Sequence, residues 1–354
     1  MTYPRIEISL GKVEHNAREL VDMCNKHDIQ VAGVTKVFCG YRPVVEAMLK
    51  GGVSLLADSR IENFEKIKDL DTPKLLLRLP MISQAESVVK LTDISLNSEL
   101  ETMRVLSQAA IKNGKTHKVI LMVDLGDLRE GIFKEENVYR AVEEIIHLQG
   151  IELIGIGTNL TCYGGVVPRQ DNLNNLLEIK DNLEKKYSIT LEMVSGGNSS
   201  SIHLLESGEI PKNINQLRLG ESIVLGRETA FGNRNKDTFD DCFKLVVEII
   251  EIKEKPSIPI GEIGMDAFGN KPTFIDKGVR KRAICAVGKQ DVDISDVIAD
   301  DEQISILGSS SDHIILDITE CSNEYMIGDK MTFNLTYGGV LSIFTSEYVK
   351  KVIK

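Results

Sequence analysis

Several features are scarce or missing in this chain of 354 residues, and each absence excludes a class of protein. No apolar run reaches the roughly 18 residues that a helix needs to cross a bilayer, so we expect no membrane span. Basic residues are outnumbered, with 42 Lys plus Arg against 53 Asp plus Glu, and a net charge of -11 argues against nucleic-acid binding. The first ten residues lack a basic stretch followed by an apolar run, so we expect no secretory signal and a cytoplasmic location.

Metal-ligand and disulfide patterns are missing as well. The six cysteines are scattered without a C-x-x-C pair, and the six histidines do not cluster. We therefore expect reduced thiols, no metal site and no His-based catalytic triad.

The first two thirds of the chain contain a regular alternation of short apolar runs and helical patterns. Eight strand-like runs, from Val31–Val34 to Ile214–Leu217, follow one another in this way. Such units build a closed parallel barrel surrounded by helices, so we predict an α/β fold with a TIM-type (β/α)8 barrel over residues 1–232. The alternative is an open doubly wound sheet, but that fold usually has a glycine-rich first turn, which Val34–Val37 lacks.

The pattern changes after about Arg227. Helical stripes give way to strand-like runs, among them Phe243–Ile252 and Met331–Phe344, which turn-rich pieces separate. This sequence pattern predicts a mainly-β C-terminal domain over residues 233–354. A further strand-like segment, within residues 1–10, precedes the barrel and suits either domain.

Active sites of such barrels lie at the carboxyl ends of the strands, where this sequence places a lysine. Lys36 ends the first strand. One interpretation is a solvated charge at the rim of the barrel, and the other is an amine that forms a Schiff base. The apolar neighbours Val37 and Phe38 favour the second, because such an amine needs desolvation to be nucleophilic near neutral pH.

Three further strand ends supply candidate binding groups. Arg129 follows the fifth strand, and its forked guanidinium suits a carboxylate; the alternative is an ion pair with an acid of its own loop. The seventh strand leads into Ser195–Ser201, whose small residues open a helix and indicate either a phosphate site or an ordinary helix cap. Gly220 follows the eighth strand and can bring its backbone close to the same phosphate.

Together, the strand-end lysine, the Ser/Asn segment, Arg218–Gly220 and the β domain resemble the alanine racemase family of fold-type III pyridoxal-phosphate enzymes. The resemblance covers nearly the whole chain, starting with Arg5–Leu10 and His15-Asn16. Within the family, Val34–Gly40 and Gly264–Pro272 resemble the branch that acts on ornithine.

The resemblance implies roles for particular residues. Lys36 would carry pyridoxal 5'-phosphate as an internal aldimine and serve as one of two bases. Asn198, Ser199 and Gly220 would hold the phosphate, and Arg129 would bind the substrate carboxylate.

Arg218 matches the arginine that faces the pyridine nitrogen of the cofactor in this family. Its charge disfavours a pyridinium ring, which suits racemization, whereas related decarboxylases have a glutamate at this place. The family's second base, a tyrosine contributed by the partner subunit, reads Met265 here. Asp266 is interpreted as its replacement or as a contact for the ammonium of a diamino acid, with an exposed turn residue as the alternative. Tyr348 is a candidate for contact with the phosphate, because Gly40 stands where the family has a tyrosine.

The sequence therefore predicts a pyridoxal-phosphate-dependent amino acid racemase that interconverts L- and D-ornithine by removing and returning the α-proton on opposite faces of the external aldimine. The resemblance implies a homodimer whose partner subunit completes each site. Racemization of alanine, lysine or a broad range of amino acids is the nearest alternative. A non-catalytic pyridoxal-phosphate carrier is the alternative from another class, but such single-barrel proteins lack the β domain. The acidic strand-end residues Asp124 and Asp127 offer a site for a second substrate ammonium.

Overall fold

The computed structural model describes residues 2–266 and 268–354 and contains two compact units. One unit is Leu10–Asp240, and the other joins the N-terminal segment up to Ser9 with Asp241–Lys354. Ala267, which belongs to one of the segments that resemble the ornithine branch, lies outside the described residues. Within those residues, no helix has the length and apolar character needed to span a membrane.

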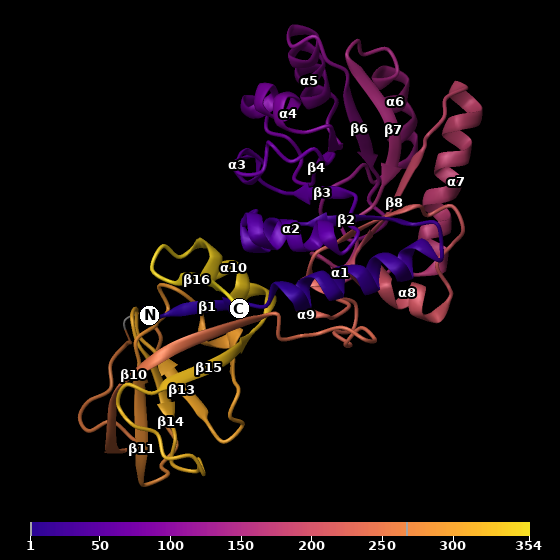
Figure 1. The fold of residues 1–354 in the computed structure, drawn as a ribbon. Helices are drawn as coiled ribbons and strands as arrows, with labels where there is room; N and C mark the ends of the chain where they lie inside the picture. The colour runs from indigo at the N-terminus through magenta and orange to yellow at the C-terminus, as the bar shows by residue number, and fades with distance from the viewer. Residues whose placement is uncertain (1, 267) are drawn as a thin grey trace. The chain divides into compact units, whose positions relative to one another are not determined.

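The unit Leu10–Asp240 is a closed barrel of eight parallel strands with helices on its outside (Figure 1). The strands follow one another around the barrel in chain order, and the last pairs with the first. The predicted TIM-type barrel is confirmed. Its strands are β2 (Gln30–Val34), β3 (Leu55–Asp58), β4 (Lys74–Leu76), β5 (Ile94–Asn97), β6 (His117–Met122), β7 (Ile151–Gly157), β8 (Met193–Asn198) and β9 (Gln216–Leu219).

Helices alternate with these strands, and each helix buries an apolar stripe against the sheet. In the first helix, Val13, Ala17 and Leu20 recur at helical spacing and are fully buried. The helices are α1 (Leu10–Asn25), α2 (Arg42–Lys50), α3 (Ile61–Glu65), α4 (Ala85–Leu91), α5 (Leu100–Lys112), α6 (Glu135–Ile145), α7 (Gln170–Tyr187), α8 (Ile202–Ser207) and α9 (Glu221–Leu225), with 3-10 turns η1 (Lys36–Phe38), η2 (Ile82–Gln84) and η3 (Ser199–Ser201).

The interior of the barrel is filled by apolar residues from alternate strand positions. Ala32 and Val34 of β2 and Ile120 and Met122 of β6 belong to one buried cluster. Because successive side chains of a strand point to opposite faces, the residues between them face the helices. This packing holds the strands rigidly and leaves their carboxyl ends as the place for a binding site.

The second unit contains an eight-stranded sheet, which confirms the predicted mainly-β character of the C-terminal region. Its first strand pairs with two others, antiparallel to β10 and parallel to β16, so the N-terminal strand joins this sheet. The elements are β1 (Arg5–Ile8), β10 (Phe243–Pro256), β11 (Val279–Cys285), η4 (Ile294–Asp296), β12 (Val297–Ala299), β13 (Ser305–Ser309), β14 (Ile314–Asp317), β15 (Lys330–Leu335), α10 (Tyr337–Thr345) and β16 (Lys350–Ile353).

One expected strand is wrong in its second half. The run Met331–Phe344 was expected to be strand-like throughout, but β15 ends at Leu335 and α10 follows. Thr336 caps this helix, because its hydroxyl accepts a hydrogen bond from the backbone N–H of Gly339 at 3.3 Å. Val340, Ile343 and Phe344 are buried at helical spacing, so packing favours the helix over the strand that the apolar composition suggested.

A buried histidine lies at the start of β6. His117 is 1% exposed, and its Nε2 is 2.8 Å from the hydroxyl of Ser95 on the neighbouring strand β5. Burial lowers the pKa of His117 to about 4, because the protonated ring would lose its hydration. The histidine is therefore neutral in the folded protein at neutral pH.

We expect His117 to weaken the fold in acid. Its pKa is lower in the folded than in the unfolded chain, so its contribution to stability is present above about pH 6.5 and is lost as the pH falls toward 4. Compared with His117→Gln, the wild type should lose up to about 3 kcal/mol of unfolding free energy over this interval. Denaturant titrations at several pH values measure it. His27→Gln, at an exposed site, is the control, and an equal pH slope in all three proteins would contradict the assignment.

Candidate active site

Lys36 is the first residue of the turn η1, immediately beyond the carboxyl end of β2. It is partly buried, and its positive charge acts on Glu221, the residue that follows Gly220. Burial raises the pKa of Glu221, and the charges of Arg227 and Lys36 oppose that shift. The structure thus brings the predicted Schiff-base lysine close to the strand end that carries Gly220.

A buried hydrogen-bond network fixes the backbone beside Lys36. The hydroxyl of Thr35 donates to Oδ2 of Asp58 at 2.5 Å, and Asp58 Oδ1 accepts from Nδ2 of Asn63 at 3.0 Å. Both Thr35 and Asp58 are fully buried. Burial raises the pKa of Asp58, while the bonds from Thr35 and Asn63 act in the opposite direction. This network connects β2 to β3 and gives the Lys36 turn a defined position.

Strand register directs Arg218 into the barrel. Arg218 pairs with Ala32 across β9 and β2, and Ala32 belongs to the interior cluster. On the other side of β9, Ser195 of β8 pairs with Gln216. Both residues are in register with Met122 of the interior cluster, so their side chains also point into the barrel. Polar groups of β8 and β9 therefore meet next to the apolar cluster that fills the barrel.

The guanidinium of Arg218 is held by hydrogen bonds from three directions. Nη1 donates to the hydroxyl of Ser195, which itself donates to Oε1 of Gln216. Nη2 donates to the carbonyl of Thr158 at 2.7 Å and to Oδ1 of Asn159 at 3.4 Å. Arg218 is 4% exposed, and this burial lowers its pKa to about 10. Its charge and orientation are thus set by neutral oxygen atoms at the ends of β7 and β8.

The residues predicted to hold a phosphate lie together at the ends of β8 and β9. The hydroxyl of Ser199 accepts hydrogen bonds from the backbone N–H groups of Gly220, at 3.4 Å, and Ser222, at 3.2 Å. Asn198 bridges to the end of β7, since its Nδ2 donates to the carbonyl of Leu160 at 2.9 Å. The structure therefore brings Asn198, Ser199 and Gly220 into one cluster.

The segment around these residues differs in one respect from expectation. Ser195 to Asn198 belongs to β8 itself, whereas the sequence suggested that the strand ends before Ser195. Glycine is needed here, because a Cβ on Gly196 would lie 2.4 Å from a methyl group of Ile214, and Gly197 has a φ of +113°. The strand thus continues through Gly196 and Gly197 and delivers Asn198 directly to the site.

Several buried polar atoms at these strand ends have no hydrogen-bond partner among the described residues. They are Oγ1 of Thr158, Nδ2 of Asn159 and Oγ of Ser200. Buried polar groups are usually satisfied, so orphaned groups that converge on one end of the barrel indicate a polar ligand. Together with Lys36, Arg218 and a cluster of backbone N–H groups, they fit a phosphorylated pyridine aldehyde.

Arg129 lies in the loop after β6 and already binds a carboxylate. Its Nη2 donates to Oε1 of Glu130 at 2.6 Å, and its Nε donates to Oε2 of the same side chain. The hydrogen bonds to Glu130 raise the pKa of Arg129 above its ordinary value. The ion pair considered from the sequence is therefore present, and the guanidinium geometry still suits a carboxylate.

Asp124 and Asp127 hold backbone in place, a task that the sequence did not indicate. Asp124 Oδ1 accepts from the N–H groups of Gly126 and Leu128 at 2.8 and 3.1 Å. Asp127 accepts from three N–H groups of the loop after β7, those of Thr161, Tyr163 and Val166, at 3.0 to 3.1 Å. Both carboxylates thus organise the loops around the site.

Asp266 and Tyr348 belong to the other compact unit. The carboxylate of Asp266 accepts from the backbone N–H groups of Phe268 and Asn270 at 2.9 and 2.8 Å. These bonds lower the pKa of Asp266, which makes it a weaker base. Tyr348 is 61% exposed. The predicted roles of both residues stay predictions.

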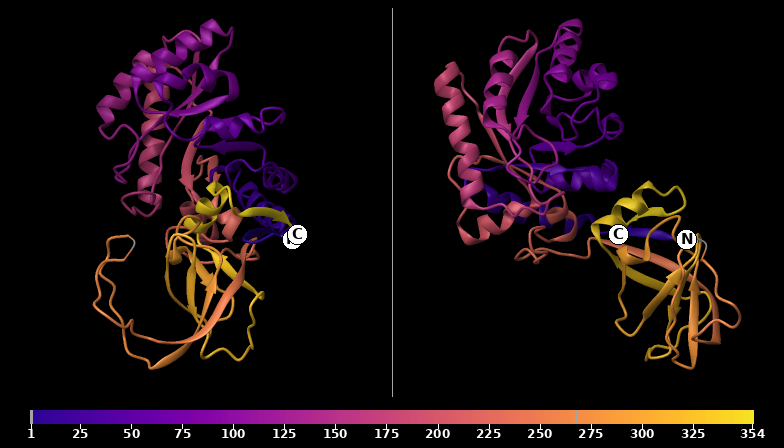
Figure 2. Two further views of the ribbon diagram at one scale, coloured as in Figure 1. Left: turned by 90° about the vertical axis from the view of Figure 1, so that its left-hand side faces the viewer. Right: turned by 180° about the vertical axis from the view of Figure 1, so that it is seen from behind.

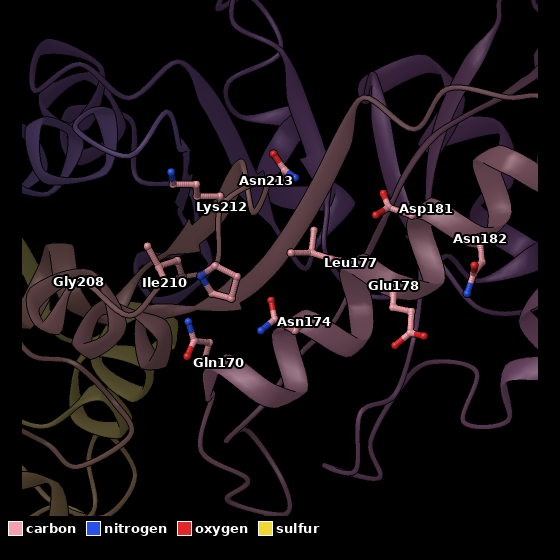
Figure 3. A pocket seen from close by; sticks show the side chains of 11 residues that line it. Gln170, Asn174, Leu177, Glu178, Asp181, Asn182, Gly208, Ile210, Lys212 and Asn213 are labelled. Atoms are coloured by element: carbon pink, nitrogen blue, oxygen red, sulfur yellow. The ribbon is translucent and has the colours of Figure 1, made fainter.

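A separate cavity of about 730 Å³ lies between α7 and residues 208–213, which lead into β9 (Figure 3). Gln170, Asn174 and Asp181 line it from α7, and Lys212 lines it from the other side. None of the residues that line it belongs to the predicted site. The cavity is therefore separate from the predicted site.

Comparison with known proteins agrees with this architecture. The family described as "Alanine racemase, N-terminal domain" matches residues 8–228. Ornithine racemase from Acetoanaerobium sticklandii is 50% identical over 349 residues, which cover 99% of each chain. Lysine racemase from Thermotoga maritima is 43% identical over 355 residues, again covering 99% of each chain. The chain belongs to the alanine racemase family.

A solved structure of this family has the same fold. Alanine racemase from Bartonella henselae, determined with covalently bound pyridoxal phosphate, superposes with a TM-score of 0.76 over all of both chains at 16% identity. This chain therefore has the fold of that structure over its whole length.

Sequence reasoning missed the residues that support the functional groups of this family member. Ser195, Gln216 and Asn159 hold Arg218, and Asp58 supports the turn of Lys36. Part of this was detectable, because Gln216 and Arg218 stand two residues apart in a buried strand and so share a face. The pairing with Ser195 follows an irregular register between β8 and β9, for which the sequence holds no signal.

Asp127 should matter for the stability of the barrel unit. Asp127→Asn removes the charge and one of the acceptors that bind three backbone N–H groups, so the free energy of unfolding should fall by about 1 to 3 kcal/mol. Denaturant unfolding measures this change, and proteolysis of the loop after β7 should accelerate. Asp181→Asn, at a side chain 71% exposed, is the matched control and should change stability by less than about 0.5 kcal/mol. Equal stability of both variants would contradict the assigned role.

Proposed function

We propose that this protein is a pyridoxal-phosphate-dependent racemase that interconverts L- and D-ornithine. The observation that carries the proposal is the 50% identity to an ornithine racemase over 99% of both chains. The site described above supports it, because a strand-end lysine, a buried arginine and the cluster of Ser199 with the N–H group of Gly220 lie at the same end of the barrel.

The residues at the ends of β2, β8 and β9 suit the cofactor. Lys36 would attach it, Asn198, Ser199 and Gly220 would bind its phosphate, and Arg218 would face its pyridine nitrogen. Pyridoxal phosphate, when bound, supplies an electron sink that stabilises the α-carbon of an amino acid after its proton has left. The second unit supplies Tyr348 as a further candidate for contact with the phosphate.

Arg218 favours racemization over reactions that need a stronger electron sink. Its guanidinium is held in place by the hydroxyl of Ser195 and the carbonyl of Thr158. Although burial lowers the pKa of Arg218 to about 10, the group stays protonated at neutral pH. A cation at this position discourages protonation of a neighbouring pyridine nitrogen.

Proton transfer requires one base on each face of the substrate. The amine of Lys36 would take the α-proton on one face, and Arg129 would orient the substrate through its carboxylate. Asp266 is our candidate for the second base or for contact with the substrate ammonium. The N–H groups of Asn270 and Phe268 lower the pKa of Asp266, which weakens it as a base.

The proposed activity is tested by the absorption and optical rotation of the purified protein. Wild type should show a visible absorption band of the cofactor, and reduction with borohydride should attach the cofactor permanently to the chain. The optical rotation of added L-ornithine should decay to zero. Lys36→Ala should lose the fixation and about a thousand-fold or more of the rate, because it removes both the attachment point and a base. Lys50→Ala, at an exposed lysine, should behave like wild type.

Two results would contradict the proposed activity in different ways. A bound cofactor with unchanged rotation of ornithine would indicate a carrier or another substrate. Absence of any cofactor band after incubation with pyridoxal phosphate would remove the cofactor assignment itself.

We also propose that two copies form a dimer, with the partner completing each site. The described part of the segment 257–278, between β10 and β11, extends as a long arm from its own sheet, in orange in the left view of Figure 2. This arm exposes large apolar side chains, with Ile260 92%, Met265 79% and Ile275 78% exposed. Clustered exposed apolar residues favour burial against another protein surface.

Charges on the arm should therefore weaken the dimer. Ile260→Asp and Ile275→Asp should each raise the dimer dissociation constant by about tenfold or more, since burying such a side chain contributes roughly 1.5 to 3 kcal/mol. Sedimentation velocity measures the association, and circular dichroism checks the fold. Ile111→Asp, on α5 and 54% exposed, is the control. A wild type that is monomeric and fully active would contradict the proposal.

A further inference from the structure

The arginine proposed to bind the substrate carboxylate is held by an acid of its own loop. Glu130 uses both carboxylate oxygens on Arg129, one on Nη2 at 2.6 Å and the other on Nε. This two-pronged arrangement is the one that a substrate carboxylate would form with an arginine. Glu130 therefore occupies the position that an incoming amino acid has to take.

Glu130 is the more buried member of this pair. Its side chain is 14% exposed, compared with 40% for Arg129. Its negative charge also acts on Arg218, which is buried in the mouth of the barrel. The carboxylate of Glu130 thus faces the site, where its electrostatic interactions are stronger than those of a surface ion pair.

A rigid turn presents the pair. Gly131 has a φ of +126°, and a Cβ there would lie 2.6 Å from the backbone nitrogen of Asp124, so the chain folds back on itself here. Ile132 donates to the carbonyl of Met122 at 2.8 Å, and Asp124 holds the other side of the turn. Glu130 is consequently fixed at the backbone, while its side chain is able to change partners.

The neighbouring acidic side chains bind backbone N–H groups. Asp124 binds N–H groups of its own turn, and Asp127 binds three N–H groups of the loop after β7. Glu130 differs from both, since its hydrogen bonds go to an arginine that the substrate itself would bind.

We propose that Glu130 selects diamino acids: the substrate carboxylate replaces it on Arg129, and the released Glu130 carboxylate binds the side-chain ammonium of the same substrate. This inference rests on the proposed function and names the residue that recognises its substrate class. The exchange leaves no buried charge unpaired, because Arg129 then binds the substrate carboxylate and Glu130 binds the side-chain ammonium. An amino acid without a second ammonium would leave Glu130 sheltered and unpaired, which disfavours its binding.

Norvaline provides the test, because it has the carbon chain of ornithine without the side-chain ammonium. The wild-type holoenzyme should racemize ornithine with a far higher kcat/KM than norvaline. In Glu130→Gln the kcat/KM for ornithine should fall about 30-fold or more, while that for norvaline stays equal or rises. Thermal stabilisation by racemic ornithine and by racemic norvaline measures binding independently of turnover, and Glu130→Gln should lose it only for ornithine.

Control variants make the result decisive. Glu136→Gln, at an exposed acid of α6, should keep the wild-type preference. If Glu130→Gln fails to fold by circular dichroism, Glu130→Asp replaces it and should lower the ratio of ornithine to norvaline by a smaller factor. An unchanged ratio in the Glu130 variant overturns this inference, and so does a ratio that falls in Asp266→Asn alone. A wild type that racemizes neither compound overturns the proposed function as well.

Discussion

The carboxyl end of this barrel depends on one buried cation. Arg218 lies where apolar side chains fill most of the interior, and moving a guanidinium there costs hydration free energy that neutral acceptors have to replace. The hydroxyl of Ser195, the carbonyl of Thr158 and the amide of Asn159 supply those acceptors. Their positions explain why β8 and β9 have the polar residues Ser195, Gln216 and Arg218 next to the apolar cluster of the barrel.

The same arrangement connects the two ends of the proposed cofactor site. Asn159 accepts from Arg218 and also from Asn198, at 3.4 and 3.2 Å, so the group that would face the pyridine ring and the group that would face the phosphate share a partner. Cys162 joins this set through its contact with Nδ2 of Asn198 at 3.4 Å. The two ends of the proposed site are therefore connected through the side chain of Asn159.

The fold and the principal site positions followed from regularities that a sequence contains. Alternating strand and helix patterns determine a barrel, and the strand-end rule then points to Lys36, Arg129 and Gly220, whereas the role of Arg218 is implied by the resemblance to the family. The rest depended on contacts between distant segments. Whether Met331–Phe344 becomes strand or helix is decided by packing and by the Thr336 cap, because the apolar run is compatible with both. The bond between Ser195 and Gln216 depends on strand register, which composition does not encode.

The strand β1 has a consequence for how the chain matures. It precedes the continuous barrel segment Leu10–Asp240 in the chain, yet both of its sheet neighbours, β10 and β16, follow that segment. During translation the barrel segment is therefore synthesised while β1 has neither neighbour. A nascent chain thus carries an unpaired strand edge throughout the synthesis of its barrel.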